Sequence, residues 1–265
     1  MTDPALILVL GMHRSGTSFL AGTLQTYGLY SGTVHEWSKH NRRGNRENPD
    51  VMALNDALLV RNGASWDSPP KQGVISAWGD DHRAEGVAIL EQMEVEAEGR
   101  PIGFKDPRTL LTLPFWEASA SSIRTIGTLR SPVAVAKSLH SRDKSMGIEQ
   151  GFHLWEIYNR VLLEEIAHDR CVGLVNFDWK ERDLRATAHV LAQKLALPWS
   201  AQRTSDFYST ELRHQTGGVP LNTSEPQPSL AQKELYTELS HAAMKSKAGW
   251  LRQTMFRLSA RRSRL

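Results

Sequence analysis

Short, largely apolar runs recur along the chain, and polar or glycine-rich segments separate them. The runs are ALILVL at residues 5–10, PIGFK at 101–105, SIRTIGTLR at 122–130 and CVGLVNFD at 171–178. Short runs of this kind are typical of strands that are buried on both faces of a parallel sheet. We predict a strand in each of them, and a turn at residues 105–107 after the second.

Six longer segments carry apolar residues at the spacing of a helix. Residues suited to helix ends flank them, because Gly28 closes the first segment, Pro49 begins the second and Ser131 begins the fourth. Strands that alternate with helices indicate an α/β fold, in which helices cover both faces of a parallel sheet. The six segments are residues 18–28, 49–63, 80–99, 131–145, 151–169 and 179–197.

The length of 265 residues fits one domain with an appendage. We expect the domain over residues 1–216. A Pro-, Thr- and Ser-rich linker at 217–229 leads into polar helical sequence that ends in RLSARRSRL, so residues 217–265 are expected to form an appendage of the same domain. The basic end could contact an anionic membrane surface or a protein partner, and a solvated helix end is the alternative.

Composition narrows the class of protein. Apolar residues make up 40% of the chain and charged residues 23%, which is ordinary for a globular protein with a core. The formal net charge of +3 favours an anionic ligand but is too small to indicate nucleic acid. The single cysteine, Cys171, excludes an intramolecular disulfide. ALILVL is too short to span a bilayer, and no signal peptide precedes it, so we expect a cytoplasmic protein without a transmembrane segment.

The segment GMHRSGTS at residues 11–18 lies between the first predicted strand and the first predicted helix. It fits the phosphate-loop (P-loop) pattern G-x-x-x-x-G-K-[ST], except that Thr17 stands where the lysine should be. Glycines let the backbone approach an anion, and the N-terminus of the following helix adds partial positive charge. Since the cation of this loop is Arg14, the loop suits an anion other than a metal-bound triphosphate. A plain strand-to-helix turn is the alternative.

This loop and the segment LRSPVAVAKSL at residues 129–139 together resemble the two cofactor signatures of sulfotransferases that use 3′-phosphoadenosine 5′-phosphosulfate (PAPS). In that family the first signature binds the 5′-phosphosulfate and the second binds the 3′-phosphate. GFKDPRTLLTLPFW at 103–116 and LVNFDWKERDLRATAHVLAQKLALP at 174–198 are similar to the bacterial, carbohydrate-type subgroup. The resemblance covers roughly residues 5–215. It implies a P-loop-containing parallel sheet and the transfer of a sulfuryl group to an acceptor hydroxyl.

The resemblance also implies a role for each signature. Arg14 matches a lysine or arginine of the family, and such a side chain, aimed at the leaving 5′-phosphate, stabilises the charge that builds there. A sulfuryl group carries less negative charge than a terminal phosphoryl group, so no metal is required. Arg130 and Ser138 match the pair that binds the 3′-phosphate, and the forked guanidinium of an arginine suits a phosphate dianion. The alternatives are a solvated charge at the strand end for Arg130 and an ordinary helix residue for Ser138. The candidate cofactor-binding residues are His13, Arg14, Ser15, Gly16, Thr17, Ser18, Arg130 and Ser138.

The acceptor hydroxyl needs a base, which in many members of the family is a glutamate or histidine after the first helix. Glu47 lies in that segment and is the candidate base. Alternatively, it caps the helix that begins near Asp50. His13 competes with it because imidazole titrates near neutral pH, although its place in the loop suits packing or orienting the phosphate.

Lys105 completes the candidate catalytic set with Glu47 and Arg14. It resembles a lysine that faces the reaction centre in relatives acting on sugars, and an ion pair with Asp106 is the alternative. Two further residues, Arg213 and His214, could close over the cofactor.

Three tryptophans, Trp37, Trp66 and Trp78, lie in the region expected to form the acceptor wall. Exposed tryptophan faces suit the binding of sugar rings, and the alternative is that these tryptophans are partly buried residues of the core. The resemblance favours a carbohydrate or glycolipid hydroxyl, while a phenol or another small-molecule hydroxyl stays open.

Two other classes of function also stay open. A phosphotransferase of the P-loop group would use Asp178, after the last strand, to hold a metal, which the missing loop lysine argues against. A non-catalytic module would bind the nucleotide without transferring a group.

Overall fold

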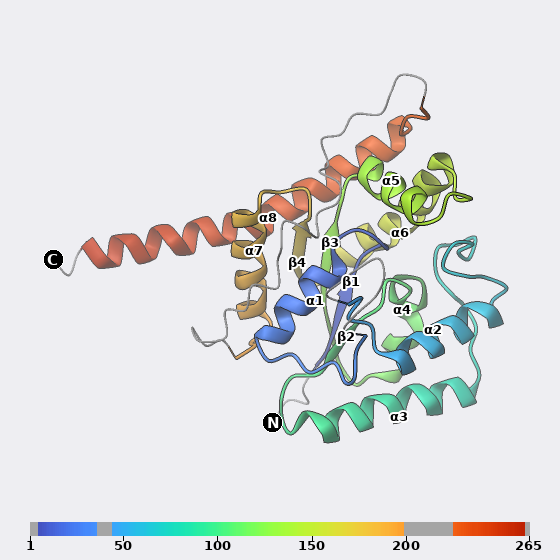
Figure 1. Ribbon diagram of the computed structural model, residues 1–265. Helices are drawn as coiled ribbons and strands as arrows, with labels where there is room; N and C mark the ends of the chain where they lie inside the picture. The colour runs from blue at the N-terminus through green and yellow to red at the C-terminus, as the bar shows by residue number, and fades with distance from the viewer. Residues whose placement is uncertain (1–4, 36–43, 199–224, 263–265) are drawn as a thin grey trace.

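A four-stranded parallel sheet forms the centre of the molecule, in the order β2-β1-β3-β4 (Figure 1). The computed structural model describes residues 5–35, 44–198 and 225–262. Each strand lies within one of the four apolar runs, as predicted. The strands are β1 Leu6–Leu10, β2 Gly103–Lys105, β3 Ile123–Leu129 and β4 Cys171–Asn176.

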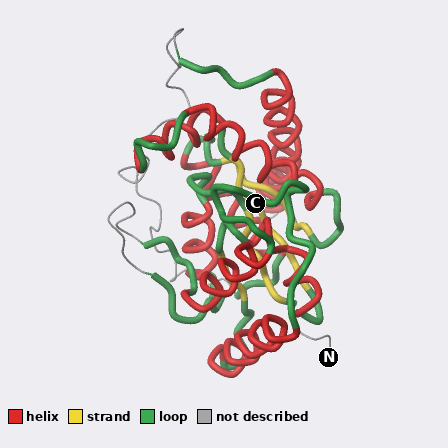
Figure 2. The backbone as a smooth tube through the Cα atoms, turned by 90° about the vertical axis from the view of Figure 1, so that its right-hand side faces the viewer, coloured by secondary structure: helices red, strands yellow, loops and turns green. Residues whose placement is uncertain are grey.

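Helices cover both faces of this sheet, which confirms the predicted fold class (Figure 2). The alternation along β1 makes the two faces visible. Ile7 and Val9 pack into one apolar cluster with residues of α1 (Thr17–Thr26) and α7 (Glu181–Lys194), whereas Leu8 packs into a larger cluster on the other side. The remaining helices are α2 (Pro49–Arg61), α3 (Asp80–Ala97), α4 (Thr109–Ser119), α5 (Pro132–Arg142), α6 (Ile148–Ile166) and α8 (Leu230–Arg262).

The helix ends follow the residues that mark them in the sequence. Gly28, with a φ of 95°, follows α1 and donates its N–H to the carbonyl of Gln25. Ser131 is the N-cap of α5, and its hydroxyl accepts the N–H of Ala134. Local backbone chemistry therefore sets these boundaries, as expected for capping residues.

The helix α4 is missing from the sequence-based expectation, which placed only a strand and a turn in this region. Its apolar side chains are buried nearly all round, so the segment carries no polar stripe that would reveal a helical period. Pro114 stands inside it as well, which weakens a helical pattern further. Burial from several sides explains both features, because α4 packs against α2, α3, α6 and β1.

The helix α8 covers the outer edge of β4 and then extends past the rest of the molecule (Figure 1). The hydroxyl of Ser246 accepts the N–H of Leu174 at 3.0 Å, which satisfies an edge donor of the sheet. Gly173, with a φ of 148°, permits this approach, because a Cβ at that position would lie 2.5 Å from Ser246 Oγ. Among the described residues, no helix is long and apolar enough to cross a membrane.

A buried asparagine, Asn55 of α2, joins α2 to α4 and to the turn after β2. Its side-chain oxygen accepts hydrogen bonds from Thr112 Oγ1 at 2.7 Å and Trp116 Nε1 at 2.9 Å. Its amide donates to Asp106 Oδ2 at 3.0 Å and to Thr109 Oγ1 at 3.3 Å. Since Asn55 is fully buried, no solvent can replace these partners.

We expect Asn55→Ala to lower the free energy of unfolding by about 3 kcal/mol or more, because each buried polar group left unsatisfied costs about 1–3 kcal/mol. Urea denaturation followed by circular dichroism measures the loss. Asn159→Ala is the matched control, since Asn159 is also buried but donates a hydrogen bond only within its own helix, to the Trp155 carbonyl. It should cost about 1 kcal/mol. Equal losses would mean that the Asn55 network does not hold the two helices.

Candidate functional site

The loop between β1 and α1 is wedged between the ends of β3 and β4. Gly11 and Gly16 have φ values of 144° and 94°, which favour glycine. A Cβ on Gly11 would lie 2.4 Å from Thr128 Oγ1, and one on Gly16 would lie 2.3 Å from the Phe177 ring. The glycine spacing therefore reflects close packing of this loop as well as its backbone conformation.

The hydroxyls of the loop hold the loop itself in place. Ser15 donates to the Met12 carbonyl at 2.6 Å and lies 2.9 Å from Thr128 Oγ1. Ser18 donates to the Asn45 carbonyl at 3.0 Å. The N-cap of α1, Gly16, has no side chain to cap the helix, so the first-turn N–H groups carry partial positive charge without a side-chain cap.

Arg14 connects the two signatures that the sequence separates. Its Nε donates to Ser138 Oγ of α5 at 2.9 Å, and its carbonyl accepts a hydrogen bond from Arg130 Nη1 at 3.0 Å. Burial, reinforced by the charge of Arg142, lowers the pKa of the Arg14 guanidinium. Among the described residues, no carboxylate pairs with Arg14. The described part of the site therefore holds a partly buried cation without a carboxylate partner.

Arg130 follows the last residue of β3 and is almost fully buried. Its guanidinium lies 5.6 Å from the centre of the Phe177 ring, and its Nε lies 3.9 Å from Asp178 Oδ1. Asp178 Oδ2 accepts the N–H of Ser131 at 2.6 Å. The carboxylate proposed above as a metal ligand is thus engaged with protein groups, and the part of the chain that the structure describes contains no cluster of three or more metal-binding side chains.

Glu47 and Lys105 form a buried ion pair, with 2.6 Å between Glu47 Oε1 and Lys105 Nζ. Lys105 also donates to the Asn45 carbonyl at 2.8 Å, the same oxygen that Ser18 contacts. The carbonyl of Asn45 thereby links the first turn of α1 to the end of β2. The two candidate catalytic residues are brought together across 58 positions of sequence.

Neighbouring residues take the structural roles that were the alternatives for this pair. Asn48, instead of Glu47, caps α2, because its Oδ1 accepts the N–H of Asp50 at 2.9 Å. Asp106 pairs with Arg108 at 2.9 Å, so it is not the partner of Lys105. Helix capping and the Asp106 pair therefore do not explain why Glu47 and Lys105 are buried here.

His13 lies beside Arg14 and is buried against Trp66, with 4.7 Å between the ring centres. Burial and then the positive charge of Arg108 and Lys105 hold the pKa of His13 well below its usual value, so the ring is neutral. Its Nε2 is buried and has no hydrogen-bond partner among the described residues. An orphaned ring nitrogen next to the loop can donate to or accept from a ligand.

The tryptophans differ in their relation to this site. Trp66 packs on His13, and its carbonyl accepts the hydroxyl of Tyr158 at 2.8 Å. Burial raises the pKa of Tyr158 well above its usual range, so the phenol stays a donor. Trp78 packs edge-on against Phe115 of α4, within the wall of the core. The other candidates of this group, Trp37, Arg213 and His214, lie outside the described residues.

Sequence reasoning missed the contributions of Tyr158, Phe177 and Arg108. Arg108 carries a visible signal, because its spacing of two from Asp106 permits a local ion pair. Tyr158 and Phe177 have no such signal, because each reaches the site from a distant part of the chain and resembles an ordinary core residue in the sequence.

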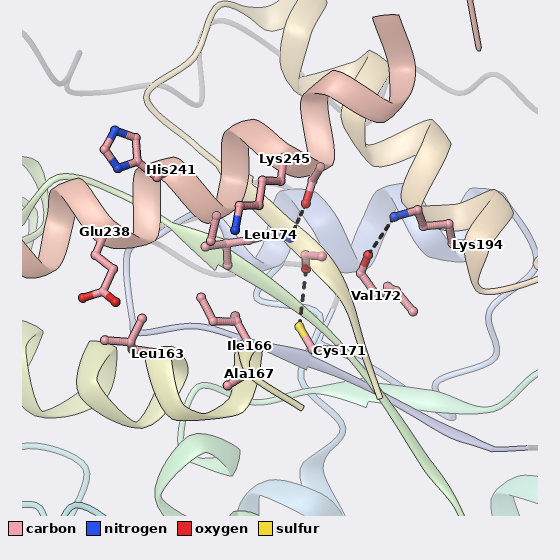
Figure 3. A pocket seen from close by; sticks show the side chains of 13 residues that line it. Leu163, Ile166, Ala167, Cys171, Val172, Leu174, Lys194, Glu238, His241 and Lys245 are labelled. Carbon is pink, nitrogen blue, oxygen red and sulfur yellow. Dashed lines mark hydrogen bonds between the residues drawn. The ribbon is translucent and has the colours of Figure 1, made fainter. Parts of the chain in front are cut away.

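A cavity of about 580 Å³ lies elsewhere, between α6, β4, α7 and α8 (Figure 3). Lys194, which donates to the Val172 carbonyl, and Cys171 are among the residues that line it. None of the predicted site residues lines this cavity. We therefore assign the candidate site to the loop region at the carboxyl ends of the strands.

Solved structures with the same arrangement of elements were found. A sulfotransferase domain from the curacin biosynthetic pathway is 13% identical, with 91% of this chain and 99% of that chain covered and a TM-score of 0.57. A sulfotransferase domain from the Synechococcus PCC 7002 olefin synthase is 18% identical, with coverage of 91% and 97% and a TM-score of 0.55. The fold is that of a sulfotransferase domain. Neither a family model nor a curated protein sequence matches the chain.

The neutral, buried state of His13 predicts an acid-sensitive contribution to stability. Below its ordinary pKa of about 6.5, the unfolded chain takes up a proton at His13 that the folded chain does not, so the folded state is destabilised as pH falls. Between pH 7.5 and 5.5, we expect the stability of the wild type relative to His13→Gln to fall by about 1 kcal/mol. Urea unfolding at both pH values measures this, with exposed His168→Gln as the control. An unchanged difference would contradict a neutral His13.

Proposed function

We propose that this protein is a sulfotransferase that moves the sulfuryl group of PAPS to a hydroxyl of a small molecule or glycan. The observation that carries the proposal is the pair of hydrogen bonds that Arg14 makes with Ser138 and Arg130. These bonds join both cofactor signatures at the N-termini of α1 and α5, where anions are favoured. The shared fold with sulfotransferase domains supports the same conclusion.

The residues at this place fit a ligand with two separate anionic groups. Arg14 and the uncapped first turn of α1 would hold the 5′ end, while Arg130 and Ser138 would hold the 3′-phosphate. The hydroxyls of Ser15 and Ser18 already bond to the protein, so the rest of the loop, from His13 to Ser18, would contribute mainly backbone N–H groups and the His13 ring. When bound, PAPS supplies the activated sulfuryl group and a 5′-phosphate leaving group, with no metal required.

Glu47 is the base we assign to the acceptor hydroxyl. Lys105 holds Glu47 Oε1 at 2.6 Å, and the second oxygen, Oε2, would take the proton. Lys105 holds the Glu47 carboxylate in place and adds positive charge beside the sulfuryl group, which is transferred in line. Arg14 stabilises the negative charge that builds on the leaving 5′-phosphate. Trp66 is half-buried next to His13, and an aromatic ring at this place suits a sugar, so a carbohydrate or glycolipid hydroxyl is the proposed acceptor.

The proposal is tested by incubating the protein with labelled PAPS and a panel of glycans, glycolipids and phenols, followed by mass analysis. We expect a sulfated product that forms in the presence of a chelator. Phosphate transfer from ATP that depends on magnesium would replace the proposal with a phosphotransferase. Nucleotide binding without any transfer would identify a non-catalytic module.

Calorimetry with adenosine 3′,5′-bisphosphate should give the same affinity with and without a chelator.

Arg130→Ala should weaken binding of adenosine 3′,5′-bisphosphate about tenfold or more, because a charge-assisted contact is worth about 1.5–3 kcal/mol. Binding of adenosine 5′-monophosphate should change little. Arg124→Ala is the matched control, since Arg124 lies near the opposite end of β3. Equal losses for the two nucleotides would mean that Arg130 does not bind the 3′-phosphate.

We expect Glu47→Gln to lower turnover by about 10²–10⁴-fold while the cofactor affinity stays nearly unchanged, because glutamine cannot take the proton. Initial rates and calorimetry on one preparation give both quantities. Glu165→Gln is the control, since Glu165 is also buried and pairs with Arg170 away from the site. If turnover survives in Glu47→Gln, the base assignment is wrong and His13→Asn becomes the variant to measure.

A further inference from the structure

The C-terminal helix α8 reaches the carboxyl end of β4 through a tyrosine. The hydroxyl of Tyr236 donates to Asp178 Oδ2 at 2.9 Å, and the same oxygen accepts the N–H of Ser131 at 2.6 Å. Burial, together with the negative charge of Asp178, raises the pKa of Tyr236 to about 12, so the phenol remains a donor at neutral pH. Two donors thus fix one oxygen of the Asp178 carboxylate.

The other oxygen of Asp178 faces Arg130. Asp178 Oδ1 lies 3.9 Å from Arg130 Nε, which is a loose ion pair. Arg130 also contacts the Arg14 carbonyl, at 3.0 Å from Nη1, and the Phe177 ring. The carboxylate therefore orients the guanidinium without the close bidentate contact that would compete with a phosphate.

A tryptophan of α6 ties the same tyrosine to the backbone of Arg130. Trp155 Nε1 donates to the Arg130 carbonyl at 2.9 Å, and the rings of Trp155 and Tyr236 lie 6.3 Å apart. Asn176 adds a second polar link, because its amide donates to Tyr236 Oη at 3.3 Å and to Ser240 Oγ at 3.4 Å. The end of α8 that packs on the sheet is thus connected to Arg130 through both side chain and main chain.

We propose that Tyr236 and Asp178 are positioning residues for Arg130, so that α8 sets the affinity of the site for the 3′-phosphate of the nucleotide. This inference rests on the proposed function. Without the Tyr236 hydroxyl, the carboxylate is held by one donor fewer and can rotate toward the guanidinium. Arg130 then loses its fixed orientation or pairs more closely with Asp178, and either change weakens binding of a phosphate at Arg130.

The test compares the dissociation constants of adenosine 3′,5′-bisphosphate and adenosine 5′-monophosphate by calorimetry on the full chain. In the wild type we expect the 3′-phosphorylated nucleotide to bind at least about tenfold more tightly. Tyr236→Phe keeps the ring and its packing but removes the donor. It should lower this preference by about three- to tenfold and leave adenosine 5′-monophosphate binding unchanged. Asp178→Asn, which removes the charge but keeps an acceptor for Ser131, should lower it as well.

Thr237→Ala is the matched control, because Thr237 is the next residue of α8, is exposed, and donates its hydroxyl to the Lys233 carbonyl of the same helix. It should leave the preference unchanged. A preference that survives in both Tyr236→Phe and Asp178→Asn would overturn the positioning role alone. An equal loss in Thr237→Ala would also overturn it, because the effect would then come from any change on α8 and not from the Tyr236 hydroxyl. A wild type with no preference for the 3′-phosphate would overturn the proposed function together with this inference.

Discussion

The structure at the carboxyl ends of the strands depends on how buried positive charge is balanced. Lys105 has Glu47, Arg108 has Asp106, and the carboxylate of Asp178 lies near Arg130. The Arg14 guanidinium contacts the neutral hydroxyl of Ser138. A cation that is partly removed from water is destabilised when no opposite charge lies nearby, so an anion bound at Arg14 would be favourable.

This charge balance explains why the sheet order matters for the site. The strand β1 lies between β2 and β3, so the loop that follows it is flanked by Lys105 on one side and Arg130 on the other. The helices α1 and α5 begin at the same end of the sheet and add the partial positive charge of their N-termini. The parallel sheet therefore brings together cations from segments that lie far apart in the chain.

Most of the fold could be predicted from the sequence, because its boundaries rest on local chemistry. The apolar runs mark the strands by their composition, and Gly28 and Ser131 set the ends of their helices through contacts within a few residues. The helix α4 could not be predicted, since its pattern comes from burial on several sides, which is a property of the assembled molecule.

The candidate site, like the fold, could be predicted from the sequence only in part. The glycine-rich loop between a strand and a helix indicates the place of Arg14, and the resemblance to sulfotransferases identifies Arg130 and Ser138 as candidates. Their mutual hydrogen bonds, and the pairing of Glu47 with Lys105 across the fold, appear only in three dimensions. The roles assigned to these residues in binding and catalysis stay predictions until they are measured.

The contact between Ser246 and Leu174 also bears on the outer edge of the sheet at β4. An uncovered edge strand presents unpaired N–H and C=O groups and can add a strand from another molecule. The helix α8 takes up the outward N–H of Leu174 at this edge through Ser246, and Gly173 allows the close approach. A larger residue at position 173 would clash with Ser246 and Leu191, so we expect it to move α8 away from β4 and to leave the N–H of Leu174 available to a strand of another molecule.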